Sequence, residues 1–178
     1  IIISFMGRKN SKNTKSKTSH GILTGTLDVT RSGIGYVIVE NREKDIFIRP
    51  QDFNHALHGD RVSVKITREG RSGRMEGEIT EVVERKQSEF VGRLELNKDF
   101  GFFIPDKAKG TPDMYIPGDK TNGAKNGDRV VVRITEWNSR DRSPNGEVIS
   151  ILNAGDENDM AMKEILVDAG FELDFDDD

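Results

Sequence analysis

Cysteine is absent from this chain of 178 residues, and only 7% of its residues are aromatic. The lack of cysteine excludes a disulfide framework and a cysteine-based metal site, and it suits a reducing, cytoplasmic environment. No apolar run approaches the length of a membrane span, so we expect no membrane partner. The three histidines are scattered and have no third kind of ligand beside them, so they predict no metal site. A P-loop, a dinucleotide-binding fingerprint and a nucleophile elbow are also missing, so we assign no catalytic residue.

Three of the few aromatic residues fall within four positions of one stretch, Lys98–Ile104, with the sequence KDFGFFI. Side chains of a strand alternate between its two faces, so Phe103 is predicted to enter a core. Phe100 and Phe102 then share the opposite face, beside Lys98. Aromatic rings on a wet, basic face are typical of a platform that stacks the bases of single-stranded nucleic acid. The alternative is that both faces of the strand are buried.

An earlier stretch, SGIGYVI, has the same order of residue types, and the match continues along both halves of the chain. The aligned positions are Ile34 with Phe100, Tyr36 with Phe102, Asp45–Ile48 with Asp113–Ile116, and Gly59–Val62 with Gly127–Val130. Residues 21–86 and 88–152 are therefore interpreted as two copies of one unit of about 65 residues.

Each copy is predicted to contain five short strands, because apolar and polar residues alternate in short runs between turn residues. In the first copy the expected strands are Ile22–Val29, Ile34–Glu40, Asp45–Ile48, Arg61–Thr67 and Met75–Glu84. In the second they are Phe90–Leu96, Phe100–Pro105, Asp113–Ile116, Arg129–Glu136 and Asn145–Ile151. A short helical turn is expected over Asp52–Leu57, and a positive φ would explain glycine at both Gly59 and Gly127. The fold class is all-β.

One short amphipathic helix is predicted after the second copy, over Asp159–Gly170, with Asp159 as N-cap and Gly170 as the C′ residue. At helical spacing one apolar stripe forms on it. Its members are Met162, Ile165, Leu166 and Ala169. We expect this stripe to dock either onto the second copy or onto a domain beyond this chain.

The motif Lys-x-aromatic-Gly-aromatic-aliphatic, followed by aliphatic-aromatic-aliphatic, resembles the paired RNA-binding motifs of the cold-shock domain. Two such units in tandem, each with a Gly-Asp-Arg-Val turn, resemble the N-terminal half of ribonuclease R, a bacterial 3′→5′ exoribonuclease of the ribonuclease II family. The resemblance covers roughly residues 21–175. It implies two five-stranded OB-fold barrels that capture single-stranded RNA for a processive exoribonuclease. It also implies a Mg²⁺-dependent catalytic domain that is absent from this chain, so whether the chain itself is an enzyme stays open.

The RNA-binding residues expected from these motifs are aromatic or apolar residues of the strands and cations close to them. They are Ile34, Tyr36, Phe47, Arg31 and Arg49 in the first copy, and Lys98, Phe100, Phe102 and Tyr115 in the second. Further candidate cations are Lys107, Lys109 and Arg133. Because Ile34 stands where the motif has an aromatic residue, the first copy should stack bases less strongly than the second.

The formal net charge of −4 is the sum of two chain ends of opposite charge. Residues 1–20 carry five Lys and Arg and no acid, which predicts a basic flexible arm that either contacts RNA or is a solvated tether. Residues 153–178 carry ten acids and one Lys. In this tail Asp168 and Asp174–Asp177 are spaced like the metal-binding aspartates of ribonuclease R-like enzymes. Proline is missing after Asp168, which lies on the predicted helix, so we interpret residues 153–178 as helix and acidic linker towards a catalytic domain.

Two other functions remain open from the sequence. A stand-alone, non-catalytic RNA chaperone would need neither the helix nor the acidic tail. A protein-interaction module without nucleic acid would bury the aromatic faces against a partner, but the flanking Lys and Arg argue against it. We favour RNA binding, with an intramolecular contact to a downstream catalytic domain.

Overall fold

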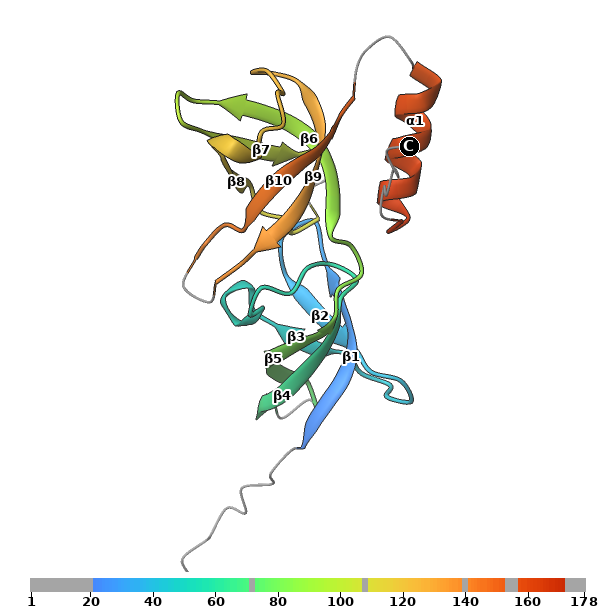
Figure 1. Cartoon of the computed structure of the whole chain (residues 1–178). Helices are drawn as coiled ribbons and strands as arrows, with labels where there is room; N and C mark the ends of the chain where they lie inside the picture. The colour runs from blue at the N-terminus through green and yellow to red at the C-terminus, as the bar shows by residue number, and fades with distance from the viewer. Residues whose placement is uncertain (1–20, 71–72, 107–108, 139–140, 153–156, 172–178) are drawn as a thin grey trace, which may run out of the picture.

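The computed structural model describes residues 21–70, 73–106, 109–138, 141–152 and 157–171, and its strands form two barrels joined end to end (Figure 1). Barrel 1 contains β1 (Ile22–Val29), β2 (Gly35–Ile38), β3 (Ile46–Ile48), β4 (Arg61–Glu69) and β5 (Met75–Glu84). Barrel 2 contains β6 (Glu89–Leu96), β7 (Phe100–Pro105), β8 (Met114–Pro117), β9 (Arg129–Glu136) and β10 (Asn145–Ile151). The predicted basic arm, Lys107 and the aspartates after Phe171 lie outside the described residues. No helix in the described part of the chain is long and apolar enough to cross a membrane.

The two barrels have the same topology. Each closes in the order first, second, third, fifth and fourth strand, and the pairing of third with fifth strand is parallel whereas the other pairings are antiparallel. The prediction of two tandem five-stranded OB-type barrels followed by one helix is therefore confirmed.

Alternating apolar residues fill each barrel. In β4, Val62 and Val64 are fully buried, and Phe103 of β7 is fully buried as predicted. The two cores are not separate, because Leu57 of the segment before β4 packs among the buried residues of barrel 2. Residues 85–88 link β5 to β6, and contacts cross this link, so the domain limits of 21–86 and 88–152 stay predictions.

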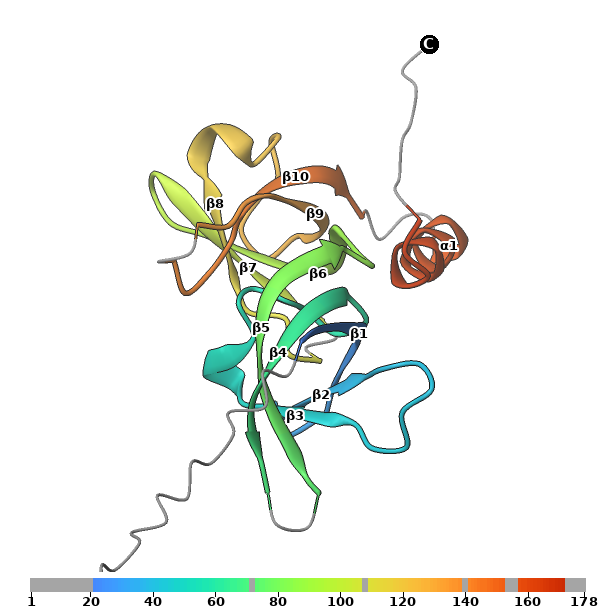
Figure 2. The same cartoon turned by 90° about the horizontal axis from the view of Figure 1, so that it is seen from below.

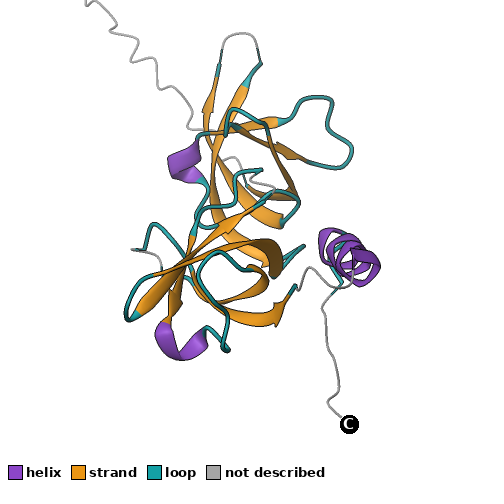
Figure 3. Ribbon diagram, turned by 90° about the horizontal axis from the view of Figure 1, so that it is seen from above, coloured by secondary structure: helices purple, strands orange, loops and turns teal. Residues whose placement is uncertain are grey.

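A helical turn follows β3, but not where the sequence predicts it. The 3₁₀ turn covers Pro50–Asp52, whereas the expected range was Asp52–Leu57. Proline at the first helical position favours an early start, because its fixed φ already suits a helix. Asn54 and His55 then have positive φ angles of 46° and 64°, which end the helical path. A second 3₁₀ turn, Gly118–Lys120, follows β8, and both turns lie outside the barrels (Figure 3).

Gly59 and Gly127 have φ angles of +90° and +88°, as predicted for the turns before β4 and β9. Their surroundings differ. The aliphatic stem of Lys86 occupies the place of a Cβ atom at Gly59, whereas the space around Gly127 is open. Gly59 is therefore constrained twice, by its backbone angle and by the link between the barrels.

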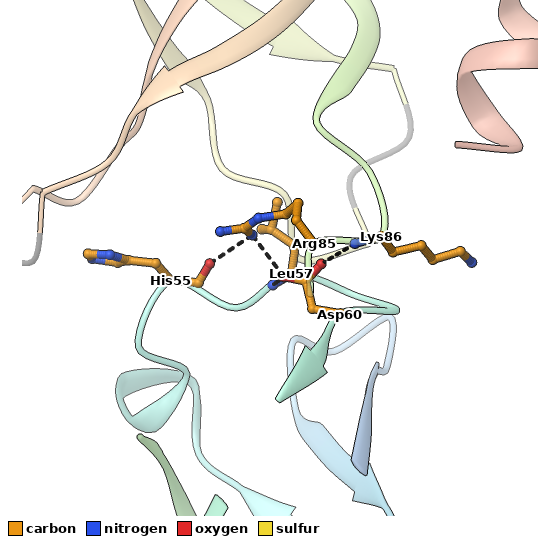
Figure 4. Close-up of polar contacts among 5 residues, drawn as sticks. All are labelled: His55, Leu57, Asp60, Arg85 and Lys86. Atoms are coloured by element: carbon orange, nitrogen blue, oxygen red, sulfur yellow. Dashed lines mark hydrogen bonds and ion pairs between the residues drawn. The ribbon is translucent and has the colours of Figure 1, made fainter. Parts of the chain in front are cut away.

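The link between the barrels is held by one buried carboxylate. Asp60 is fully buried and accepts hydrogen bonds from the Leu57 N–H at 2.8 Å, the Lys86 N–H at 3.0 Å and the Arg85 guanidinium at 2.8 Å (Figure 4). Burial raises the pKa of Asp60, while the two N–H donors and Arg85 lower it. Arg85 also donates to the His55 carbonyl at 3.0 Å. Asp60 thus ties the segment before β4 to the start of the link.

A second contact between the barrels is aromatic. The His55 imidazole stacks on the Trp137 indole with ring centroids 4.6 Å apart and an interplanar angle of 12°. Trp137 lies just after β9 and donates its indole N–H to the Asp141 carbonyl at 3.1 Å. Burial, and then the charge of Arg85, lower the pKa of His55, so a neutral imidazole is favoured in this stack.

Helix α1 (Glu157–Asp168) stands beside β6 of barrel 2 (Figures 1 and 2). The N-cap prediction was wrong, because the helix begins before Asp159. The prediction for Gly170 is confirmed, since its φ is +85° and the Phe171 N–H bonds the Leu166 carbonyl at 3.0 Å. This pairing is a Schellman motif, which favours glycine at C′.

The prediction that the apolar stripe of α1 docks onto barrel 2 was also wrong. Met162, Ile165 and Leu166 are 60%, 67% and 37% exposed, and Ala169 is exposed too. Val167 is the residue that docks, fully buried against Val91, Val131 and Leu152. An ion pair between Arg129 and Glu164 holds the same face of α1 against barrel 2. Glu164 and Val167 share this face because they are three residues apart on the helix.

We predict that Val167→Asp releases α1 from barrel 2, because a carboxylate would replace a buried apolar side chain worth about 1.5–3 kcal/mol. Amide hydrogen exchange should show α1 losing protection while the strands keep theirs. Ile165→Asp is the matched control, since Ile165 is already exposed, and it should leave the exchange pattern unchanged. Equal effects of the two substitutions would mean that the helix docks through another face.

Candidate nucleic-acid interface

Phe100, Phe102 and Tyr115 form one cluster on the outer surface of barrel 2, which we call the aromatic trio. Phe100 lies 5.5 Å from both other rings between centroids, stacked on Tyr115 at 28° and edge-on to Phe102 at 84°. Phe102 is 45% exposed and Tyr115 36% exposed. The outer face therefore offers aromatic surface to solvent, and the alternative that both faces of β7 are buried is wrong.

Strand pairing positions the aromatic trio. Phe102 of β7 pairs with Tyr115 of β8, and the buried Phe103 beside Phe102 anchors the strand from the other face. Edge-on and offset rings are the preferred arrangements of aromatic pairs, so the three rings support one another at the surface. Rings held this way provide a preformed platform on which a base can stack.

Two cations border the aromatic trio. Lys98 is exposed in the turn between β6 and β7, as predicted. Arg93 of β6 is exposed beside Ile104, and the sequence analysis missed it. A signal existed, because the short turn after Leu96 sets the β6–β7 register and places Arg93 on the outer face. Glu95 pairs with Phe102 in the same sheet, so the surroundings of the trio are mixed in charge.

The corresponding aromatic pair of barrel 1 is less exposed to solvent. Tyr36 of β2 and Phe47 of β3 pair across the sheet with ring centroids 5.9 Å apart at 69°. Both rings and the neighbouring Ile34 are half-buried, and Arg31 is exposed in the turn before β2. The structure thus brings Tyr36 and Phe47 together, but these rings expose less surface than Phe102 and Tyr115 of barrel 2.

A group of three arginines surrounds Phe47, and we call Arg49, Arg68 and Arg74 the arginine cluster. The Arg74 guanidinium lies 4.3 Å from the centre of the Phe47 ring. Glu76 binds the other two, with Arg49 at 3.1 Å and Arg68 at 3.9 Å. Arg49 was predicted at this face, whereas Arg68 and Arg74 were not. The cluster borders a pocket of about 280 Å³ that Phe47, Arg49, Arg68 and Glu76 help to line.

The other candidate cations do not join either face. Arg133 is bound through Nε and Nη2 to the buried Glu89 at 3.0 and 2.7 Å, and its role in RNA binding stays a prediction. This ion pair fixes the start of β6 against β9. Lys109 lines a separate pocket of about 280 Å³ between the barrels and α1, together with His58 and Lys86.

His58 and the acidic residues give no metal centre among the described residues. Burial, and then the charge of Lys109, lower the pKa of His58. Its Nδ1 atom accepts the Val29 N–H at 3.1 Å and lies 3.2 Å from Asp28 Oδ1. Asp168 ends α1, so the aspartate spacing seen in the sequence begins on a helix.

Family models match both barrels. Residues 25–82 match the model described as the ribonuclease B OB domain, and residues 102–176 match the cold shock domain. The two matches follow one another along the chain and fall on barrel 1 and barrel 2 with α1.

Curated relatives of the chain are bacterial ribonucleases R. The chain is 30% identical over 160 residues to ribonuclease R of Thermotoga maritima, which covers 89% of this chain and 22% of that protein. It is 32% identical over 131 residues to ribonuclease R of Escherichia coli, covering 74% of this chain and 16% of that protein. The chain therefore spans about a fifth of the length of these relatives.

Solved structures share the fold. The RNase R of Mycoplasma genitalium, solved in complex with ribose-methylated single-stranded RNA, superposes with a TM-score of 0.72 at 15% identity, covering 87% of this chain and 25% of that one. The yeast pseudonuclease Ssd1 superposes with a TM-score of 0.71 at 20% identity, covering 84% and 25%. Both likenesses extend over the two barrels in tandem.

Proposed function

We propose that the barrels of this chain, which is similar along most of its length to bacterial ribonucleases R, bind single-stranded RNA. The observation that carries this proposal is the aromatic trio, with Phe102 45% exposed beside Tyr115. Exposed aromatic rings are unfavourable in water unless they have a partner, and bases stack on such rings whatever their sequence. Duplex RNA hides its bases in the helix, so the trio favours a single strand.

Within a longer protein, the barrels would capture substrate for a processive 3′→5′ exoribonuclease. Support comes from the ribonuclease R relatives, of which this chain matches a fifth. The catalytic domain, its Mg²⁺ ions and its contact with this chain are part of the proposal, as is a cytoplasmic location. The described residues contain no group of three acidic or histidine side chains that could hold a metal. We propose a binding role for the chain because its aromatic trio is exposed.

We expect the chain to bind a labelled single-stranded oligoadenylate and to leave its length unchanged in the presence of Mg²⁺. Mobility shift and a denaturing gel on the same samples measure both properties. A duplex of equal length is the control and should bind more weakly, because its bases cannot reach the trio. Shortening of the RNA that disappears in Asp174→Asn or Asp176→Asn would contradict the assignment of a binding role. Equal affinity for duplex and single strand would contradict base stacking.

A further inference from the structure

In the aromatic pair of barrel 1, an arginine side chain covers one of the two rings. The Arg74 guanidinium lies 4.3 Å from the Phe47 ring centre, which is the place a stacked base would take. Tyr36 meets the same ring edge-on from the neighbouring strand. In barrel 2 no described cation covers a ring of the aromatic trio in this way. The two barrels therefore offer different chemistry on corresponding faces.

The arginine cluster has more positive charge than its own carboxylate neutralises. Glu76 is shared by Arg49 and Arg68. Arg49 and Arg68 line one pocket with Phe47, Glu76 and Asp52, and Arg74 lies over the Phe47 ring. The three arginines together carry one positive charge more than Glu76 and Asp52 balance.

Guanidinium groups suit one kind of ligand especially well. A guanidinium presents parallel N–H donors that match two oxygens of a phosphate, and it keeps its charge at any physiological pH. Stacking on an aromatic ring fixes such a group while leaving its N–H edge available. The Arg74 guanidinium lies over the Phe47 ring at a distance that allows such stacking.

We propose that barrel 1 binds phosphate groups of the RNA backbone through the arginine cluster, whereas barrel 2 binds bases through the aromatic trio. This inference rests on the proposed RNA binding and deepens it, because it divides the work between the two barrels. Contacts to phosphate release counterions and depend steeply on salt, whereas stacking does not. The two barrels therefore differ in how salt affects their contribution.

The test is a salt titration of oligouridylate affinity for Arg68→Gln/Arg74→Gln. Each phosphate contact contributes about 0.7 to the slope of log K against log salt on a single strand, so the slope should become shallower by about 1.4. The affinity deficit of this variant should therefore shrink about sevenfold between 50 and 200 mM salt. Arg61→Gln removes a cation from the other end of β4 and is the matched control, with a change smaller than that of the double variant.

The variant Phe102→Ala distinguishes a failure of this inference from a failure of the proposed function. If Phe102→Ala weakens binding while the arginine variant keeps the slope of the intact chain, RNA binding stands and the phosphate role of barrel 1 is overturned. If Phe47→Leu loses as much affinity as Phe102→Ala at every salt concentration, Phe47 stacks a base and the division of work is wrong. If Phe102→Ala leaves binding intact, base stacking on the aromatic trio is wrong, and if the intact chain does not bind oligouridylate, the proposed function itself fails.

The source of the phosphate is tested with NMR signals of the arginine Nε–H groups. Oligouridylate should shift the Arg74 and Arg68 signals, and inorganic phosphate at matched ionic strength should shift the same signals only at far higher concentration. Arg61 supplies the reference signal, which should stay in place. Shifts with inorganic phosphate and none with RNA would show a site for a free anion and overturn the inference.

Discussion

Replacing Asp60 by alanine should lower the free energy of unfolding by about 3–5 kcal/mol, as expected when one partner of a buried ion pair is removed. The substitution leaves Arg85 without its carboxylate and leaves the N–H groups of Leu57 and Lys86 without an acceptor. Chemical denaturation followed by tryptophan fluorescence measures this loss, because Trp137 stacks on His55 beside the same junction.

The chain supplies its own matched control. Asp128 occupies the corresponding position of the second repeat, but its carboxylate accepts a hydrogen bond from the Lys125 N–H at 2.7 Å and is only half-buried. Asp128→Ala should cost about 0.5–2 kcal/mol, as for the loss of a capping contact. Asp60→Ala/Arg85→Met should lose less than Asp60→Ala alone, because it leaves no unpaired buried charge. Equal losses for Asp60→Ala and Asp128→Ala would refute the special role of the junction.

The double substitution Phe102→Ala/Tyr115→Ala should lower RNA affinity by about 2–6 kcal/mol, since each stacked base is worth about 1–3 kcal/mol. The loss should be similar at every salt concentration, because no phosphate contact is removed. Both side chains are exposed by more than a third, so the variant should keep its fold, which thermal unfolding checks. Fluorescence anisotropy with a labelled oligouridylate measures the affinity.

Tyr36→Ala/Phe47→Ala in barrel 1 is the counterpart of this variant. It should lose less affinity, because Ile34 stands where barrel 2 has Phe100 and because Arg74 covers Phe47. Any loss should also depend on salt, since Arg74 loses its support. A loss in barrel 1 that equals or exceeds that in barrel 2 would reverse the ranking of the two faces.

Local rules were enough to predict the platform of barrel 2. Strand alternation places Phe103 inside and Phe102 outside whatever surrounds the strand, and the structure has both. The covering of Phe47 could not be predicted in this way. Arg74 reaches the ring because β5 pairs in parallel with β3, which brings Met75 opposite Ile46. Such pairing joins residues far apart in the sequence, and no local pattern specifies it.

The error over α1 has a related cause. Helical spacing shows which residues share a face, and Met162, Ile165 and Leu166 do so. It does not show which face meets the barrel. That choice is made by a small apolar patch on β6 and β9 and by the Arg129–Glu164 ion pair, both of which form only after the barrel has closed. The alignment of the two repeats could not predict the role of Asp60 at the junction. Within this chain the first copy is linked to a second barrel, whereas the second copy is followed by α1.

We expect the place of Leu57 in the core of barrel 2 to couple the unfolding of the two barrels. Unfolding barrel 1 withdraws Leu57 and opens a hole in its neighbour, so the chain should melt in a single cooperative transition. A ligand that touches only barrel 2 then protects barrel 1 as well. An oligonucleotide at one hundred times its dissociation constant would add about 2.7 kcal/mol to the stability of both. Proteolytic resistance at β1, far from the aromatic trio, would thus report how much of the trio is occupied.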